Sequence, residues 1–229
     1  MGLILLRYGE LALKGANRPA FIRRLRRNVR ACLRENGIAG QVESSGSRLY
    51  VSTDQVEEAV PHLQRVFGLV SLSPVVEVPP EMEAMAAEAV RQARASGLGP
   101  GRSFRIQPRR ADKRFPHSSP EIGRKLGAAV VAATGARVDL SDKADLSIGV
   151  EVREDRTLVF GRVYPGPGGL PVGSSGRVVV LISGGIDSPV AAWMMMKRGC
   201  SVIPLHFRHN DVECQKALDN CRLLEQWSY

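Results

Sequence analysis

Cysteine is scarce in this sequence, with four among 229 residues, and no pair has the spacing of a zinc site or a thioredoxin-like motif. The thiols are expected to be free and mostly buried in a reducing compartment; they are Cys32, Cys200, Cys214 and Cys221. The sequence also lacks any apolar run near the roughly 18 residues that cross a bilayer. Its first residues have no basic lead-in, unlike a signal peptide. These absences predict a cytoplasmic protein that does not enter a membrane.

Acidic residues are outnumbered, since 32 Lys and Arg stand against 23 Asp and Glu, for a formal net charge of +9. Most of the excess lies in residues 1–165. A basic surface favours a polyanionic partner, because each cation near a phosphate releases condensed counterions. Solubility is the alternative explanation, and charge alone does not exclude it.

Residues 1–60 alternate between strand and helix patterns. Apolar spacing predicts strands at 3–6, near 42 and at 49–51, and helices at 19–36 and from 54 to about 67. Asp54 is expected to cap the second helix, and Pro61 is expected to kink or break it. This alternation predicts a small ferredoxin-like α/β unit.

Residues 61–165 continue with a mixed pattern. Strands are predicted at 69–78, 103–107, 146–152 and 157–163, and helices at 81–96 and from 118 or 119 to about 135. Ser118 or Ser119 suits the cap of the second helix, and the turn 153–156 joins the last two strands as a hairpin. The order of elements predicts an α+β domain.

Residues 164–176 contain three prolines and five glycines and cannot form a regular element. We place a domain boundary here, with residues 166–176 as a linker that its prolines stiffen. A buried parallel strand at 177–182, a helix at 190–198, a strand at 202–207 and a helix at 211–227 are predicted to follow. Two strands and one crossover are only the first part of a doubly wound parallel sheet, so we expect a truncated chain.

The strongest chemical signal is the run SGGIDS at residues 183–188, between a strand and a helix. Gly184 and Gly185 let the backbone turn sharply and approach a ligand. The free amides at the start of the next helix, its dipole and the hydroxyls of Ser183 and Ser188 would together bind an anion. No lysine follows the glycines, so this is not the nucleotide loop that ends in Gly-Lys-Ser/Thr.

Asp187 is unexpected in such a loop, because a carboxylate repels phosphate unless a cation intervenes. Mg²⁺ held between Asp187 and pyrophosphate oxygens resolves the conflict and would neutralise charge on the leaving group. We therefore name Asp187 as the catalytic and metal-binding candidate. The alternative is that Asp187 only caps the helix.

The run SGGIDS after a strand resembles the PP-loop of the ATP-pyrophosphatase family, whose members cleave ATP between its α and β phosphates and adenylate a carbonyl oxygen. The strand ends on either side of the loop are expected to border ATP, because ligands in open α/β sheets lie at the carboxyl ends of strands. His206 has the alternative of being an ordinary strand-end residue. The nucleotide-binding candidates are Leu181, Ile182, Ser183, Gly184, Gly185, Asp187, Ser188, His206 and Phe207.

Five segments resemble the tRNA 4-thiouridine synthase family, which also supports thiamine biosynthesis. They are residues 7–15 (RYGELALKG), 67–75 (FGLVSLSPV), 109–116 (RRADKRFP), 168–173 (GGLPVG) and 181–189 (LISGGIDSP), and they occur in the family's order. The resemblance implies a ferredoxin-like domain at 1–60, a THUMP domain at 61–165 and a partial PP-loop domain at 177–229.

The same resemblance implies that the first two domains hold the acceptor end of tRNA. The PP-loop domain would adenylate the uridine at position 8, and a persulfide supplied through a cysteine desulfurase or another donor would deliver sulfur. The family's sulfur-transfer cysteine would lie beyond Tyr229, so no catalytic cysteine is assigned. A homodimer is implied as well.

Clustered charge at residues 109–114 suits contacts with RNA phosphates. The candidates are Arg109, Arg110, Lys113 and Arg114, which stand in the segment that resembles the basic part of THUMP domains. A solvated turn is the alternative. Two other functions remain open, namely a PP-loop synthetase acting on a small metabolite and an RNA-binding module without activity.

Overall fold

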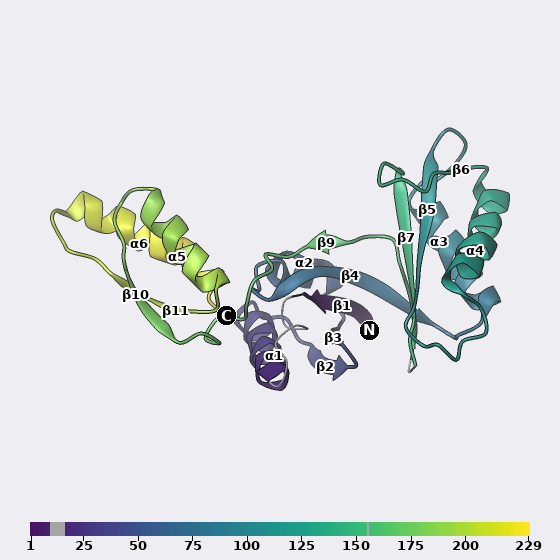
Figure 1. Cartoon of the computed structure of the whole chain (residues 1–229). Coiled ribbons are helices and arrows are strands. Elements are labelled where there is room, and N and C mark those ends of the chain that lie inside the picture. Colours follow the sequence, from purple (N-terminus) through teal and green to yellow (C-terminus); the bar gives the residue numbers. More distant parts are fainter. Residues whose placement is uncertain (10–16, 155) are drawn as a thin grey trace. The chain divides into compact units, whose positions relative to one another are not determined.

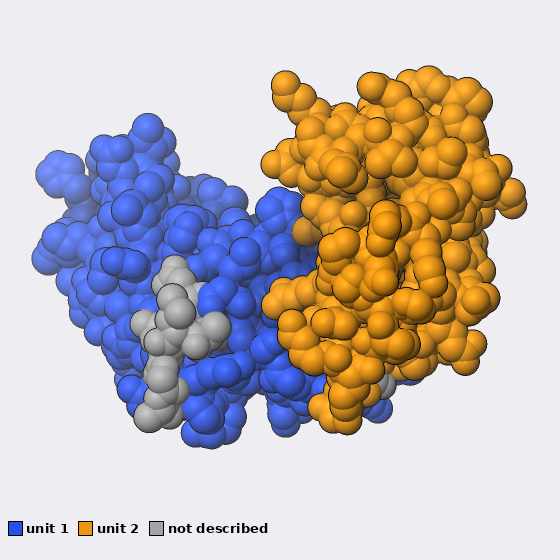
Figure 2. All heavy atoms as spheres, turned by 45° about the vertical axis from the view of Figure 1, so that its right-hand side comes forward, with its two compact units in different colours: residues 1, 3–72, 164–229 blue, residues 2, 73–163 orange. Residues whose placement is uncertain are grey.

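The computed structural model describes residues 1–9, 17–154 and 156–229 (Figure 1). It divides into two compact units, shown in different colours in Figure 2. Unit 1 comprises residues 1, 3–72 and 164–229, and unit 2 comprises residues 2 and 73–163. None of the helices in the described ranges combines the length and apolar character that a membrane span needs.

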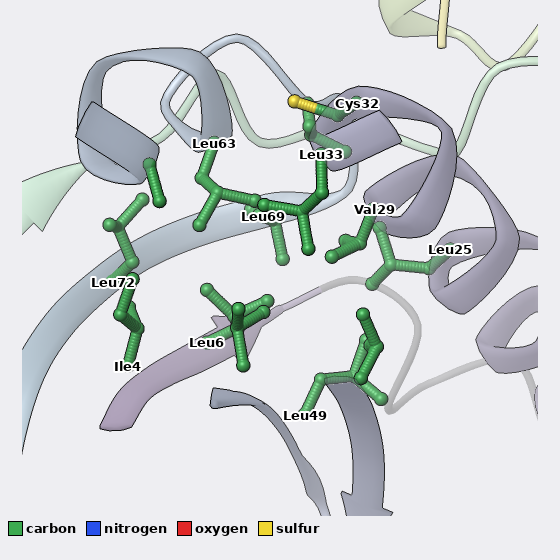
Figure 3. Close-up of a cluster of buried hydrophobic side chains, with 14 of the residues drawn as sticks. Ile4, Leu6, Leu25, Val29, Cys32, Leu33, Leu49, Leu63, Leu69 and Leu72 are labelled. Atoms are coloured by element: carbon green, nitrogen blue, oxygen red, sulfur yellow. The ribbon is translucent and has the colours of Figure 1, made fainter. Parts of the chain in front are cut away.

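The first half of unit 1 has the predicted ferredoxin-like pattern. Its strands lie in the order β2-β3-β1-β4, and helices α1 and α2 pack against them. The elements are β1 Gly2–Tyr8, α1 Arg18–Glu35, β2 Gln41–Ser45, β3 Arg48–Thr53, α2 Val56–Leu63 and β4 Leu69–Val78. Apolar residues of α1 recur on one face and meet strand residues in a common core (Figure 3).

The helix predicted from residue 54 to about 67 is shorter than expected. α2 has Gln55 at its N-cap, and no side chain caps it. Asp54 instead forms an ion pair of 3.0 Å with the amino terminus of Met1, so its predicted capping role is wrong. The helix ends at Leu63, two residues after Pro61, the residue that was expected to kink or break it.

Residues 61–72 belong to unit 1, although the sequence placed them with the second domain. Leu63, Val66, Leu69 and Leu72 are buried in the core that α1 shares with β1 and β3. This packing explains why the unit extends through α2 and into β4, which continues into unit 2 at Ser73.

Unit 2 is the predicted α+β domain. Its strands lie in the order β4-β8-β7-β5-β6, with β5 and β7 parallel and β7 and β8 antiparallel. The elements are α3 Met82–Ala95, β5 Ser103–Arg110, α4 Ser119–Thr134, β6 Arg137–Val138, β7 Leu146–Val152 and β8 Thr157–Phe160. Ser118 forms the predicted capping box with Glu121, and Gly135 ends α4 in the left-handed region.

The second half of unit 1 begins with the two-residue strand β9, Tyr164–Pro165, and contains one βαβ crossover followed by α6. β10 Arg177–Leu181 and β11 Ser201–Leu205 pair in parallel, with α5 Asp187–Lys197 between them in sequence and α6 Asp211–Glu225 after them. Ile182, Ala192 and Ala217 form the small core of the sheet and the helices. The prediction that β10 is buried is wrong, since Val179 is 58% and Leu181 60% exposed on the face that no described residue covers.

The two halves of unit 1 contact each other directly. Phe67 packs edge-on against Trp193 at 5.1 Å and lies 5.7 Å from Trp227, measured between ring centroids. The buried Asn28 donates a hydrogen bond to the carbonyl of Val172 at 3.1 Å. Residue Leu170 of the connector donates its N–H to the carbonyl of Lys197 at 2.9 Å. These contacts hold the PP-loop region against the ferredoxin-like half.

Candidate nucleotide loop and nucleic-acid interface

The loop at 183–188 leaves the carboxyl end of β10 and leads into the first turn of α5. The two serines close it, because the N–H of Ser183 donates to Ser188 Oγ at 3.0 Å and the two hydroxyls lie 3.1 Å apart. The N–H of Gly185 donates to Ser183 Oγ at 3.3 Å. The serines predicted as hydroxyl donors to a ligand therefore also fix the shape of the loop.

The two glycines differ in their surroundings. A Cβ atom on Gly184 would lie 2.9 Å from the Cβ of Lys216 and 2.4 Å from Glu213 Oε2, both on α6. A Cβ atom on Gly185 would meet only Ser183 Oγ, at 3.6 Å. Gly184 is thus required for close packing against α6, whereas Gly185 faces open space and leaves room for a ligand.

Asp187 is the first residue of α5 and is exposed. Ile186 occupies the N-cap position, and no side chain caps the helix, so the structure does not support the capping alternative. The carboxylate forms no hydrogen bond or ion pair with any described residue. The carboxylate is therefore free to bind a cation, while the positive end of the helix dipole beside it favours an anion such as phosphate.

Within the described ranges, no group of three or more His, Cys, Asp or Glu side chains is placed to coordinate a metal ion. One free carboxylate nevertheless fits Mg²⁺, which usually keeps water and phosphate ligands and takes only one or two carboxylates from the protein.

The residues that flank the loop divide into two groups. Ile182 is 3% exposed, and its N–H donates to the carbonyl of Leu205 at 2.8 Å. His206 Nδ1 lies 2.8 Å from the carbonyl of Ile182, so Nδ1 carries the proton and donates. His206 Nε2 is buried without a hydrogen-bond partner among the described residues. Leu181 and Phe207 are 60% and 74% exposed, at and just beyond the carboxyl ends of β10 and β11, respectively.

Two of the four basic candidates of unit 2 lie in a strand. Arg109 and Arg110 lie inside β5 opposite Glu151 and Val152 of β7, not in a loop after the strand. The strand accommodates Pro108 because β6 pairs only with the start of β5, at Ser103 and Phe104.

Two of these four cations have protein partners. Arg110 donates to the carbonyl of Phe115 at 3.2 Å and fixes the segment that follows β5. Arg114 forms ion pairs with Asp112 at 3.0 Å and with Glu154 at 2.9 Å, and this pairing lowers the pKa of Asp112. Arg109 and Lys113 are exposed and form no such contact in the described part of the chain, which leaves them available to phosphate.

Sequence reasoning missed the contribution of α6 to the loop. Asn220 donates hydrogen bonds to the carbonyls of Ser183 and Gly185, and Glu213 and Lys216 lie against Gly184. These residues follow the loop by about 30 positions, and no local pattern joins them to it.

The fold and the loop define a class of protein in which a ferredoxin-like unit and an α+β unit are joined to a PP-loop βαβ unit. Three family models match the chain in this order: the ThiI ferredoxin-like domain at residues 3–73, the THUMP domain at 80–161 and the thiamine biosynthesis protein ThiI at 173–228. The chain belongs to the tRNA sulfurtransferase (4-thiouridine synthase) family.

Relatives and solved structures agree with this assignment. The chain is 43% identical to a probable tRNA sulfurtransferase of Moorella thermoacetica and 39% identical to one of Caldanaerobacter subterraneus, and it is covered to 98% in both comparisons. It spans only 58% and 59% of these relatives.

Two crystal structures are similar over the whole chain. PH1313 from Pyrococcus horikoshii superposes with a TM-score of 0.90 at 32% identity, and 76% of that protein is covered. A 4-thiouridine synthetase in complex with RNA and bound ATP superposes with a TM-score of 0.83 at 31% identity, and 59% of it is covered.

Proposed function

We propose that this chain forms the tRNA-binding and ATP-binding part of a cytoplasmic tRNA 4-thiouridine synthase. The observation that carries the proposal is the loop at 183–188, which ends in an exposed and unpartnered Asp187 at the start of α5, in a chain of the tRNA sulfurtransferase family. The similar 4-thiouridine synthetase holds RNA and ATP, which supports both ligands here.

ATP is the substrate that the loop would bind. The amides of the loop and the first turn of α5 would receive its phosphates, and the exposed Leu181 and Phe207 would border the adenosine. The C4 oxygen of uridine 8 then attacks the α phosphorus, and pyrophosphate leaves. The terminal sulfur of a persulfide would then attack C4 and displace AMP, which leaves the base joined to the donor by an S–S bond. A second thiol would cleave that bond, releasing 4-thiouridine and leaving a disulfide between the two thiol groups.

Asp187 would hold Mg²⁺ on the side of the loop that faces the phosphates. When bound, Mg²⁺ would supply positive charge to offset the charge on pyrophosphate. The protein would contribute the single carboxylate to the ion, and the remaining ligands would be water and phosphate oxygens.

Unit 2 would supply phosphate contacts through Arg109 and Lys113, while Arg110 and Arg114 shape the segment that presents them. The proposed organisation is a ferredoxin-like domain, a THUMP domain, a short connector at 166–176 and a PP-loop region. A cysteine desulfurase or another persulfide donor would supply the sulfur, and a homodimer is the expected assembly.

The proposal is tested by titrating this chain with tRNA at several salt concentrations, with the 3′ end intact and trimmed. We expect affinity to fall with salt and with trimming. A folded sample that does not bind tRNA would contradict the proposal. ATP–pyrophosphate exchange driven by a small acid without tRNA would instead support a metabolite synthetase.

A further inference from the structure

One side chain of α6 holds two carbonyl groups of the SGGIDS loop. Asn220 Nδ2 lies 3.0 Å from the oxygen of Ser183 and 3.2 Å from the oxygen of Gly185. An amide nitrogen carries two hydrogens, so it can donate to both oxygens at once. The opposite orientation of the amide would place its oxygen against two other oxygens, so the donor role is the one that the contacts allow.

These two bonds fix the direction of two peptide groups. In a planar trans peptide, the carbonyl of one residue and the N–H of the next point in opposite directions. Because the carbonyls of Ser183 and Gly185 point at Asn220, the N–H groups of Gly184 and Ile186 point away from α6.

Two other amides of the loop are already engaged. The N–H of Ser183 donates to Ser188 Oγ, and the N–H of Gly185 donates to Ser183 Oγ. Gly184 and Ile186 donate to no described residue. Together with the unpaired N–H groups of Asp187 and Ser188 in the first turn of α5, they are backbone donors that the loop offers to a ligand.

The position of Asn220 is itself fixed by packing. Ala217, one turn earlier on α6, is 2% exposed and lies in the core formed with Ile182 and Ala192. Gly184 allows the loop to approach the same helix, since a larger residue would collide with Lys216. The amide therefore reaches the loop from a rigid element.

We propose that Asn220 is a positioning residue, which turns the N–H groups of Gly184 and Ile186 toward the pyrophosphate portion of ATP. This inference rests on the proposed function of the loop and adds a residue from outside the SGGIDS run. Asn220 does not touch the nucleotide. It acts by holding the backbone that does.

Asn220→Asp provides the test, because aspartate has nearly the same size but carries no hydrogens and repels both carbonyls. The loss of each neutral hydrogen bond changes an equilibrium constant by about fivefold. Because two bonds are lost, we expect the Kd of magnesium pyrophosphate, measured by calorimetry, to rise about 25-fold or more. The midpoint of thermal unfolding is expected to change little, because Ala217 and its neighbours still anchor α6.

Gln226→Glu is the matched control. It introduces the same charge at the end of the same helix and keeps the oxygen that accepts from Arg65 Nη1 at 2.6 Å. We expect it to bind magnesium pyrophosphate as the unmodified chain does. The inference would be overturned if both variants lost affinity for magnesium pyrophosphate equally, or if Asn220→Asp lost none.

Backbone NMR separates this inference from the proposed function. The amide resonances of Gly184 and Ile186 should shift in Asn220→Asp and stay in place in Gln226→Glu, with or without ligand. An unmodified chain that does not bind magnesium pyrophosphate would contradict the proposed function. Unchanged resonances in Asn220→Asp would contradict the role of Asn220 alone.

Discussion

At the scale of single residues, Asp187 determines whether the loop needs a cation. Its carboxylate stands exposed and unpartnered among the described residues, at a loop built to receive phosphate. On the proposed function, the carboxylate would repel ATP without a cation, and with Mg²⁺ it would attract the metal–nucleotide complex. We expect Asp187→Asn to lose the gain in ATP affinity that Mg²⁺ gives, and to bind metal-free ATP at least as well as the unmodified chain.

Calorimetry with ATP in Mg²⁺ measures the affinity for the metal–nucleotide complex, and calorimetry with ATP in EDTA measures the affinity for metal-free ATP. Asp54→Asn is the control, because it removes one negative charge from the ferredoxin-like half, where Asp54 pairs with the amino terminus. Asp54→Asn should leave the Mg²⁺ dependence of the ATP affinity unchanged. A full Mg²⁺ dependence in Asp187→Asn would show that the metal is held elsewhere.

The two glycines of the loop should respond differently to alanine. Gly184→Ala places a methyl group 2.9 Å from the Cβ of Lys216, and overpacking of this kind costs about 1–3 kcal/mol in the free energy of unfolding. Gly185→Ala meets only a hydroxyl at 3.6 Å and should cost much less. Urea unfolding of both variants measures the difference, and equal losses would contradict the packing of Gly184 against α6.

Candidate residues could be named from the sequence where they lie in a contiguous motif. Ser183, Gly185 and Asp187 could be named from their order alone, because the motif requires a turn, a free backbone and a cation site. Asn220 could not be named, since its two hydrogen bonds span 37 and 35 positions and depend on where α6 packs.

At the scale of elements, α4 depends on its capping box. Ser118 Oγ accepts from the N–H of Glu121 at 3.4 Å, and the Glu121 carboxylate accepts from the N–H of Ser118 at 2.7 Å. Ser118→Ala should lower the free energy of unfolding of unit 2 by about 1 kcal/mol. Ser96→Ala is the control, because Ser96 ends α3 and its hydroxyl has no partner among the described residues.

The capping box should also depend on pH. Hydrogen bonds from Ser118 lower the pKa of Glu121. A lowered folded-state pKa means that the carboxylate stabilises the domain above its unfolded pKa, near 4.3, and that this contribution disappears as pH falls through the folded value. The difference in the free energy of unfolding between Ser118→Ala and the unmodified chain should therefore become smaller below about pH 4. A constant difference across this range would contradict the role of the Glu121 carboxylate.

Most elements followed from apolar spacing and caps, and the exceptions have physical causes. β5 continues through Pro108 because its other edge is unpaired there. β10 has the apolar sequence of a buried strand, yet one of its faces is bare in the described structure. The length of α2 depends on Pro61 and the tight turn after it, which a spacing rule does not reveal.

At the scale of the whole molecule, the order of family segments was more informative than any one of them. The segments at 109–116 and 181–189 fall inside regions that the family models match, and most of the segment at 67–75 does as well. The segment at 168–173 lies between two matched regions and reaches the second only at Gly173. Most of the segment at 7–15 lies outside the described residues. The extent of unit 1 was not predictable, because contacts such as Phe67 with Trp193 join residues more than a hundred positions apart.

The net charge of +9 leads to the last prediction, which concerns tRNA binding. Arg109 and Lys113 are exposed cations without protein partners in the described ranges, so each is free to neutralise a phosphate. Removing one such contact should reduce the slope of log K against log salt by about 1. We expect this reduction for Arg109→Ala and for Lys113→Ala, measured by binding to tRNA at several salt concentrations.

Arg222→Ala separates a contact from a change in net charge. Arg222 lies on α6 of unit 1 and forms an ion pair of 2.8 Å with Asp219, so its loss removes the same charge from a different surface. Its salt slope should match that of the unmodified chain, because long-range charge is screened beyond about 10 Å at 0.1 M salt. An equal reduction in all three variants would mean that net charge, and not a phosphate-binding surface on unit 2, sets the affinity for tRNA.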